Sequence, residues 1–247
     1  MLSENTIQRL HDMKLSTMAK TFKAQMNDTN ICELSFEDRF GLIVDAEWAT
    51  RKNNRLTRLI RNANYDIPSA CVEDIEYHAD RKLNKDMITR LGACTYIDDH
   101  SNIIIMGATG NGKTYLSNAF GMAASRNFYT VKYIRLPEML GELAIARGEG
   151  RYQRVIKQYK QVRLLILDEW LLFPLSTADA IEVLEIVNAR HKRASTIFCT
   201  QFPVEGWHDK IGEPAVADAI CDRIVHDSYK IIIHGDGMRK RKGLKES

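Results

Sequence analysis

The segment Gly107-Ala108-Thr109-Gly110-Asn111-Gly112-Lys113-Thr114 is the most informative part of this 247-residue chain. Its spacing is G-x-x-x-x-G-K-T, and the glycines let the backbone curl so that successive N–H groups face one anion. A helical pattern follows, and the positive end of such a helix points at the same anion. We expect Lys113 to contact nucleotide phosphates and the Thr114 hydroxyl to bind Mg2+. The predicted nucleotide-binding residues are Gly107, Ala108, Thr109, Gly110, Asn111, Gly112, Lys113, Thr114 and Tyr115.

Short apolar segments alternate with longer helical patterns from Asn102 onward. The candidate strands are residues 103–106, 131–134, 164–167, 196–199 and 230–233. The candidate helices are residues 113–127, 136–160, 176–193 and 205–226. Continuous apolar strands separated by helices are typical of a parallel sheet that is covered on both faces. The sequence therefore predicts an α/β fold, a P-loop NTPase with a central parallel sheet.

A pair of acids follows the apolar run Leu164–Leu167, at the expected carboxyl end of a strand. Ligands of parallel sheets bind at that edge. We expect Asp168 to hold the magnesium ion or its water shell, and Glu169 to orient and polarise the attacking water as a general base. An apolar run that ends in Asp-Glu is common by itself. After a phosphate-binding loop, however, it makes hydrolysis of ATP the expected chemistry.

Further catalytic candidates lie near the ends of two later elements. Thr200 or Gln201, after the strand 196–199, could contact the γ-phosphate or the attacking water. The alternative is that these residues are polar only because a strand end meets solvent. Arg223 could reach the nucleotide of a neighbouring subunit as an arginine finger that stabilises transition-state charge. A local ion pair with Asp222 or Asp227 is the alternative for Arg223.

The first hundred residues have a mainly helical pattern. Ser16 is a candidate helix cap, and Ser35-Phe36-Glu37-Asp38 is typical of a capping box. Apolar residues then recur at helical spacing: Phe36, Phe40, Ile43, Val44 and Trp48. We expect such a stripe, Trp48 included, to lie in a core rather than to stack on nucleic-acid bases.

These patterns divide the chain into four parts. We expect a helical N-terminal domain over residues 1–70, a connector with another helix over 71–101, an ATPase domain over 102–236 and a basic tail over 237–247. The N-terminus lacks the order of a signal peptide, no apolar run approaches the roughly 18 residues of a membrane helix, and the five cysteines are scattered. We expect a soluble cytoplasmic protein with reduced thiols and no membrane partner.

Three basic stretches are candidates for contact with DNA, although the net charge is only +3. One recurs at three- and four-residue spacing, which predicts a positive stripe on one helix face: Arg147, Arg151, Arg154, Lys157 and Lys160. The others are the run Arg51–Arg61 and the C-terminal tail. Cations of this kind neutralise phosphates without reading bases, so binding is expected to be largely non-specific and sensitive to salt. For any one stretch, a solvated helix face is the alternative.

The chain resembles the IstB-like ATP-binding proteins, the helper ATPases of insertion-sequence transposases, which are kin to the DnaC helicase loader in the AAA+ group. The resemblance covers nearly the whole chain and rests on these stretches beside the phosphate-binding loop: Leu34–Arg39, Glu47-Trp48, Leu167–Glu169, Pro174–Ser176, Asp222–His226 and Gly237–Lys240. It implies an AAA+ sheet, an ATP-dependent homo-oligomer on duplex DNA, and recruitment of a transposase. It also implies that Arg223 lies in the arginine-finger segment, and that Thr200 or Gln201 occupies the sensor position.

The sequence departs from that family at one position. Relatives usually have Asp-Glu-Leu-Gly-Tyr after the acidic strand, whereas this chain has Asp168-Glu169-Trp170-Leu171-Leu172. The loss of the glycine puts the conformation of this loop in question, while the two acids are retained.

Other functions remain open at this stage. A DnaC-type replicative helicase loader would share the ATPase parts but handle a helicase and single-stranded DNA, and the Leu34–Arg39 stretch favours the transposition helper. A scaffold that binds ATP but scarcely hydrolyses it is disfavoured by Glu169. A GTPase is disfavoured because Asn84-Lys85-Asp86-Met87 has its aspartate one place early for the guanine-reading motif. The number of subunits and the target sequence are not specified by these patterns.

Overall fold

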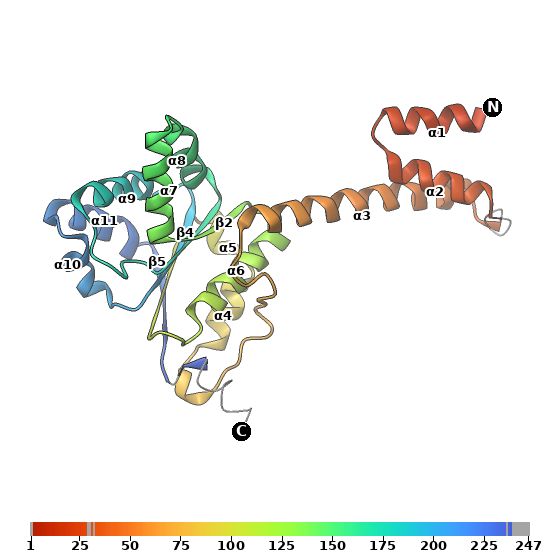
Figure 1. Cartoon of the computed structure of the whole chain (residues 1–247). Helices are drawn as coiled ribbons and strands as arrows, with labels where there is room; N and C mark the ends of the chain where they lie inside the picture. Colours follow the sequence, from red (N-terminus) through yellow and green to blue (C-terminus); the bar gives the residue numbers. More distant parts are fainter. Residues whose placement is uncertain (1, 29–30, 32, 236, 239–247) are drawn as a thin grey trace, which may run out of the picture. The chain divides into compact units, whose positions relative to one another are not determined.

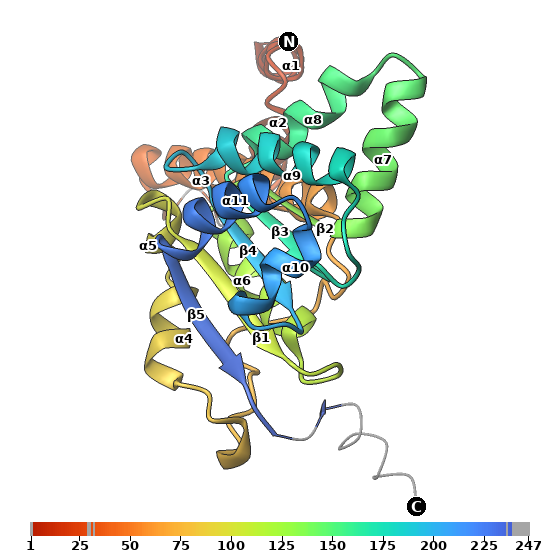
Figure 2. The ribbon, with the colours of Figure 1, turned by 90° about the vertical axis from the view of Figure 1, so that its left-hand side faces the viewer.

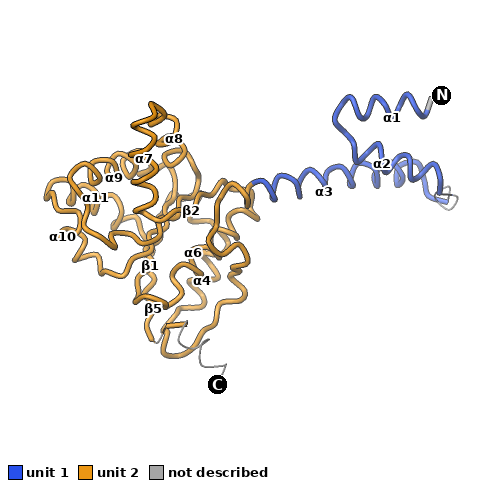
Figure 3. The backbone as a smooth tube through the Cα atoms, viewed as in Figure 1, with its two compact units in different colours: residues 1–58 blue, residues 59–247 orange. Residues whose placement is uncertain are grey.

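A computed structural model describes residues 2–28, 31, 33–235 and 237–238. It divides into two compact units, Met1–Arg58 and Leu59–Ser247 (Figure 3). The division precedes the boundary expected near residue 70, because Ala63 is buried and the Tyr65 hydroxyl hydrogen-bonds Ser125 Oγ at 2.7 Å within the second unit. The basic residues of the predicted tail, from Arg239 onward, lie outside the described residues.

The first unit contains helices α1 (Leu2–Asp12), α2 (Ser16–Met26) and most of α3 (Phe36–Ala63). The helix cap at Ser35 that the capping-box pattern predicted is confirmed, because Ser35 Oγ accepts from the Asp38 amide at 3.1 Å. The Ser35 hydroxyl in turn donates to Asp38 Oδ2 at 2.8 Å. The cap predicted at Ser16 is wrong, since Leu15 precedes α2 and makes no side-chain cap. Glu47 of α3 caps this helix instead. Its carboxylate accepts from the amides of Thr17 and Met18, two N–H groups in the first turn of α2 that have no partner within the helix.

The predicted apolar stripe of α3 is not a core in this structure. Ile43 is buried, but Phe36, Phe40, Val44 and Trp48 are exposed. The expectation that Trp48 belongs to a core is therefore wrong for the described residues. Among the described residues, α3 contacts α2 through Glu47, which accepts from the Thr17 and Met18 amides, and Ile43 is the stripe residue that is buried in this unit.

The second unit is built on a five-stranded parallel sheet of order β2-β3-β4-β1-β5. The strands are β1 (Asn102–Gly107), β2 (Val131–Arg135), β3 (Leu164–Asp168), β4 (Ser195–Thr200) and β5 (Ser228–Ile233). All five predicted strands are thus confirmed. Since the strands are parallel, their carboxyl ends meet at one edge, where β1 and β3 deliver the predicted phosphate loop and acids.

Helices cover both faces of the sheet (Figure 1). One face packs against α4 (Lys85–Gly92), α5 (Thr95–Asp98) and α6 (Lys113–Arg126). The other packs against α7 (Leu136–Gly148), α8 (Tyr152–Gln161), α9 (Thr177–Arg190), α10 (Trp207–Ile211) and α11 (Pro214–Val225). Figure 2 shows α9, α10 and α11 in front of the strands. Successive strand residues point to opposite faces of the sheet, so Ile103 lies in one core and Ile104 in the other.

Two predicted helices are broken in the structure. The pattern over residues 136–160 forms α7 and α8, separated by a turn in which Gly150 has φ 69°. The pattern over 205–226 forms the 3-10 turn η3 (Val204–Gly206), α10 and α11, with Gly212 at φ 87° between the helices. The connector contains the 3-10 turn η2 (Ala79–Arg81) and α5 besides α4. No helix of the described residues is long and apolar enough to span a bilayer.

Candidate functional site

The phosphate-binding loop runs from β1 to α6 and is supported by neighbouring backbone. Gly110 (φ 83°) and Gly112 (φ 89°) adopt left-handed conformations that favour glycine. Asn111 Nδ2 donates to the Ile233 carbonyl of β5 at 3.1 Å, and Arg81 Nη2 donates to the Asn111 carbonyl at 3.1 Å. The Asn111 side chain therefore supports the loop from its outer side.

Lys113 lies within the curl of this loop. Its Nζ donates to the carbonyls of Gly107 and Ala108 at 2.8 and 2.9 Å. These carbonyls keep the ammonium beside the amides that would surround a phosphate. The positive charge is thus already at the position where the start of α6 favours an anion.

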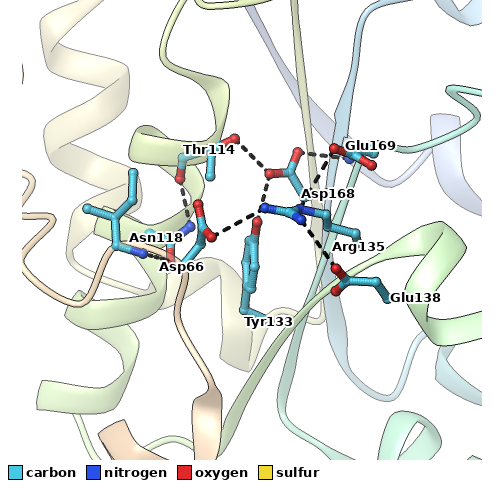
Figure 4. A network of polar contacts seen from close by, with 9 residues as sticks. Asp66, Thr114, Asn118, Tyr133, Arg135, Glu138, Asp168 and Glu169 are labelled. Carbon is cyan, nitrogen blue, oxygen red and sulfur yellow. Dashed lines mark hydrogen bonds and ion pairs between the residues drawn. The ribbon is translucent and has the colours of Figure 1, made fainter. Parts of the chain in front are cut away.

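Asp168 receives two hydroxyl donors from different elements (Figure 4). Thr114 Oγ1 of α6 donates to Asp168 Oδ2 at 2.7 Å, and the Tyr133 hydroxyl of β2 donates to the same oxygen at 2.9 Å. Burial and the neighbouring Asp168 charge raise the pKa of Tyr133, so its hydroxyl keeps its proton and remains a donor. The predicted magnesium residues Thr114 and Asp168 are therefore side by side.

Glu169 belongs to a cluster of charges centred on Arg135, the last residue of β2. Arg135 Nε lies 3.7 Å from Glu169 Oε1, and the two other guanidinium nitrogens pair with Asp66 at 3.4 Å and Glu138 at 3.2 Å (Figure 4). Arg135 is next to Asp168 in the register of β2 and β3. The predicted general base is thus half-exposed and turned toward a shared cation.

The two predicted sensor candidates have different surroundings. Thr200 is buried, and its Oγ1 accepts from the Phe202 amide at 3.1 Å, which closes a local turn. Gln201 is exposed and lines the same cavity as Lys113 and Asp168. Gln201 therefore lines the cavity beside the phosphate loop, whereas the Thr200 hydroxyl is used in this local turn.

Two cavities flank the loop. The first, of about 200 Å³, brings together most of the predicted catalytic residues; its lining includes Thr109, Gly110, Lys113, Thr114, Asp168, Glu169 and Gln201. The second, of about 410 Å³, continues past Lys113 and Tyr115 to the connector, and its lining includes Ile67, Ile75, Leu83, Leu116 and Met238. Charged side chains line the first cavity and the second is more apolar, which suits the phosphate end and the base end of a nucleotide.

Arg223 does not join this site within one chain. It lies near the end of α11, just before β5 begins, whereas the phosphate loop follows the carboxyl end of β1. Its Nη1 donates to the Ala219 carbonyl at 2.7 Å, and among the described residues no ion pair joins it to Asp222 or Asp227. Any contact of Arg223 with a nucleotide therefore requires a second subunit.

The predicted basic stripe is divided between two helices, so the single helix face expected for it is wrong. Arg147 ends α7, Arg151 lies in the turn, and Arg154, Lys157 and Lys160 lie on α8. Arg147 pairs with Glu182, Arg151 with Glu149, and Lys160 with Glu185. No ion pair is found for Arg154 or Lys157 in the described part of the chain. These two are exposed on the side of α8 that faces away from its buried residues Val155, Ile156 and Tyr159.

The loop after the acids keeps a left-handed turn without its usual glycine. Glu169 and Leu171 both have φ 54°, and the Leu171 side chain is fully buried. Trp170 is buried against Phe198 and Trp207, with ring centroids 4.7 and 5.6 Å away. The backbone strain at Leu171 is thus offset by the burial of its side chain. Asp168 and Glu169 remain at the carboxyl end of β3.

Sequence reasoning missed several residues at the site: Asp66, Arg81, Tyr133, Arg135 and Met238. Arg135 could have been found, because it directly follows the predicted strand 131–134 and the carboxyl ends of parallel strands share an edge. Arg81 lies in the connector and Asp66 lies just after the end of α3. Neither segment has a periodic pattern, so no signal placed these two residues near the loop.

Comparisons with known proteins agree with this architecture. The model of the IstB-like ATP-binding protein family matches residues 8–246. The chain is 38% identical over 245 residues to putative insertion sequence ATP-binding protein y4pL of Sinorhizobium fredii, covering 99% of this chain and all of that protein. It is 36% identical to the putative ATP-binding protein of insertion sequence IS1162 from Pseudomonas fluorescens, covering 82% of this chain and 88% of the relative.

Solved structures show the same fold at low identity. AMPPCP-bound DnaA from Aquifex aeolicus aligns with a TM-score of 0.57 and 21% identity, over 73% of this chain and 56% of DnaA. The DnaC helicase loader aligns with a TM-score of 0.54 and 15% identity, over 66% of this chain and 96% of the loader. The chain belongs to the family of IstB-like ATP-binding proteins and is an ATPase with the AAA+ fold.

Proposed function

We propose that this ATPase is a transposition helper that assembles on duplex DNA when it holds ATP, and that engages a transposase. The observation that supports this most is the meeting of Lys113, Thr114, Asp168, Glu169 and Gln201 at one cavity, in a chain whose relatives are named after insertion sequences. ATP and a chromosomal target are available together in the cytoplasm, where we expect it to act.

The residues of the first cavity divide the work of hydrolysis. Lys113 would exchange its two loop carbonyls for the β and γ phosphates, while the loop amides hold the same oxygens. Glu169 would orient the attacking water and take its proton, and Gln201 would contact the water or the γ-phosphate. Tyr115 and the apolar walls of the second cavity would hold the base.

The same cavity fits a magnesium ion. Thr114 Oγ1 and Asp168 Oδ2 are 2.7 Å apart, and a hydroxyl and a carboxylate are oxygen ligands of the kind that Mg2+ takes beside substrate phosphates. When bound, the ion would neutralise charge that develops on the phosphate oxygens. Tyr133, which donates to the same carboxylate, would keep Asp168 oriented.

Arg223 lies away from the phosphate loop of its own chain, so its predicted contact with a nucleotide would couple ATP binding to assembly. In this proposal Arg223 of one subunit contacts the nucleotide bound by the next, so ATP stabilises the joined state because it binds both. Hydrolysis removes the γ-phosphate contacts and releases or remodels the assembly.

The test is fluorescence anisotropy of labelled duplex and single-stranded DNA with the full-length protein. We expect tight duplex binding with ATP and Mg2+, weak binding without nucleotide, and prolonged binding by Glu169→Gln, which would keep ATP bound. A preference for single strands would instead support a DnaC-type helicase loader. Equal duplex binding with and without ATP would contradict the nucleotide-gated helper.

A further inference from the structure

The buried arginine Arg81, in the 3-10 turn η2, lies against the outer side of the phosphate loop. Its side chain is 5% exposed, and its guanidinium holds two backbone carbonyls at once. Nη1 donates to the Glu76 carbonyl at 2.5 Å, and Nη2 donates to the Asn111 carbonyl at 3.1 Å. Glu76 belongs to the connector and Asn111 to the phosphate loop. One side chain therefore ties the connector to the loop.

The end of β5 fixes both sides of this contact. The His234 amide donates to the Arg81 carbonyl at 3.2 Å, and Asn111 Nδ2 donates to the Ile233 carbonyl at 3.1 Å. Because Ile233 and His234 are consecutive, the same stretch of backbone holds both the arginine and the loop. Arg81 is thus fixed relative to Asn111 by hydrogen bonds that lie outside the predicted phosphate site.

The contact with Asn111 orients the peptide bond between Asn111 and Gly112. This bond is trans, so its carbonyl and its N–H point in opposite directions. The carbonyl points outward to Arg81, and the Gly112 N–H therefore points toward the inside of the loop. For this N–H no hydrogen bond is found among the described residues, so it can donate to an anion. Gly112 also allows the close approach, since a Cβ there would lie 3.3 Å from Arg81 Nη2.

From these contacts we infer that Arg81 is a positioning residue of the ATPase, which keeps the Gly112 N–H aimed at the nucleotide phosphates. The inference rests on the phosphate loop as the ATP site. Donors that are already oriented bind an anion more tightly, because their ordering costs no free energy at the moment of binding. Among the described residues, Glu169 and Gln201 line the first cavity and Arg81 does not. Arg81 therefore acts on affinity for the phosphates and not on the chemical step.

The contact requires a guanidinium rather than any cation. The planar group presents two nitrogens in a fixed geometry, which matches the carbonyls of Glu76 and Asn111. A lysine at this position would keep the charge but has a single nitrogen, so it could not hold both carbonyls in the same way. The conservative variant Arg81→Lys is therefore expected to be only partly functional.

A direct contact with the base is the alternative role for Arg81, because it also lines the second cavity beside Leu83 and Met238. Inorganic tripolyphosphate separates the two roles, since it has phosphates and no base. A residue that orients the loop affects ATP and tripolyphosphate alike, whereas a residue that contacts the base affects ATP alone.

The experiment measures displacement of a fluorescent ATP analogue from the full-length protein with Mg2+, by ATP and separately by tripolyphosphate. Arg81→Gln is expected to raise the dissociation constants of both competitors by about tenfold, the effect of losing a hydrogen bond to a charged group. Arg81→Lys should fall between Arg81→Gln and the wild type. Steady-state kinetics should show a raised KM for ATP, with kcat within about twofold of the wild type.

Arg190→Gln is the matched control, because Arg190 is also buried and also donates to backbone carbonyls, those of Tyr159 and Val162. It lies near the start of β4, at the other end of the strands from the phosphate loop. This variant should lose thermal stability and keep its affinity for ATP. Circular dichroism reports that each variant is folded, and Arg81→Lys provides the test if Arg81→Gln does not fold.

Three results would overturn the inference: weaker binding of ATP with unchanged binding of tripolyphosphate, a fall in kcat at unchanged KM, or unchanged binding of both competitors by the folded Arg81 variants. Lys113→Ala, measured in parallel, distinguishes this failure from failure of the ATP site itself. Loss of ATP binding by Lys113→Ala alone would leave the phosphate loop as the ATP site and remove the role of Arg81.

Discussion

Arg135 is surrounded by three carboxylates, those of Asp66, Glu138 and Glu169. Its Nε lies 3.7 Å from Glu169 Oε1, which turns the Glu169 carboxylate toward β2. We predict that Arg135→Gln raises basal ATP turnover a few-fold and leaves KM for ATP nearly unchanged, because Glu169 becomes free to face the water.

Steady-state kinetics measure this effect. The control is Arg163→Gln, which removes another exposed arginine paired with an acid, Asp98 at 3.3 Å, near the start of β3. A fall in kcat for Arg135→Gln would mean that Arg135 holds Glu169 in its productive position, contrary to this interpretation.

Leu171 combines a positive φ of 54° with full burial. Removing a buried leucine costs about 2–5 kcal/mol, whereas relief of a left-handed conformation returns about 1–2 kcal/mol. We predict that Leu171→Gly is less stable than the wild type, but that Leu171→Ala is less stable still, because alanine loses the side chain and keeps the strain.

The free energy of unfolding in urea is measured for the wild type, Leu171→Gly and Leu171→Ala. The order of the two variants shows whether relief of the left-handed conformation adds to stability. Alanine is normally the more stable of the two small residues, so the reversed order is specific to a left-handed position. Leu171→Ala more stable than Leu171→Gly would show that the turn relaxes without glycine.

At this scale the sequence predicted the residues whose chemistry requires a fixed spacing. Lys113, Thr114, Asp168 and Glu169 meet as expected, because the P-loop motif and the acidic strand end each specify their own local geometry. Arg81 was not predictable, because it reaches Asn111 only through the tertiary path of the connector. Thr200 and Gln201 could be told apart only once their hydrogen bonds and exposure were known.

At the scale of elements, the basic residues of α7 and α8 are the predicted contact with DNA. Arg154 and Lys157 lie on the outer face of α8, whereas Arg147 and Lys160 pair with Glu182 and Glu185. We predict that Arg154→Gln with Lys157→Gln weakens duplex binding and lowers the slope of log K against log salt by about 1.8, since each phosphate contact contributes about 0.9.

The matched control is Arg147→Gln with Lys160→Gln, measured by anisotropy across a salt series. Those cations are already neutralised by glutamates, so the slope should change less. Equal slopes for both double variants would contradict a difference between the cations that have an ion pair in the described structure and those for which none is found there.

Strands were easier to predict than helix ends and helix faces. The buried strands are continuous apolar runs, so periodicity was enough to find them. The turn at Gly150 interrupts a pattern that looks helical throughout, because the basic and apolar residues keep their spacing across it. The apolar residues of α3 have the periodicity of a core helix, but Phe36, Phe40, Val44 and Trp48 are exposed. Periodicity shows that these side chains share a helix face, and it does not show whether another part of the chain covers that face.

At the scale of the whole molecule, the separation of Arg223 from the phosphate loop predicts a shared site. Arg223→Ala would keep its own Lys113 but lack the finger, and Lys113→Ala would keep the finger but lack ATP. We predict that each variant alone has little turnover and that a mixture of the two regains part of the wild-type rate. A mixture no more active than its components would contradict catalysis across subunits.

The most direct measurement of the central claim, that Lys113 and Glu169 serve one ATPase site, combines ATP binding and hydrolysis in the same samples. Glu169→Gln is predicted to bind ATP with wild-type affinity and to lose at least about a hundredfold in turnover, because the base is gone while the loop is intact. Lys113→Ala is predicted to lose binding itself, with Lys132→Ala, on β2, as the lysine control. Near-normal hydrolysis by Glu169→Gln, or normal ATP binding by Lys113→Ala, would contradict the account.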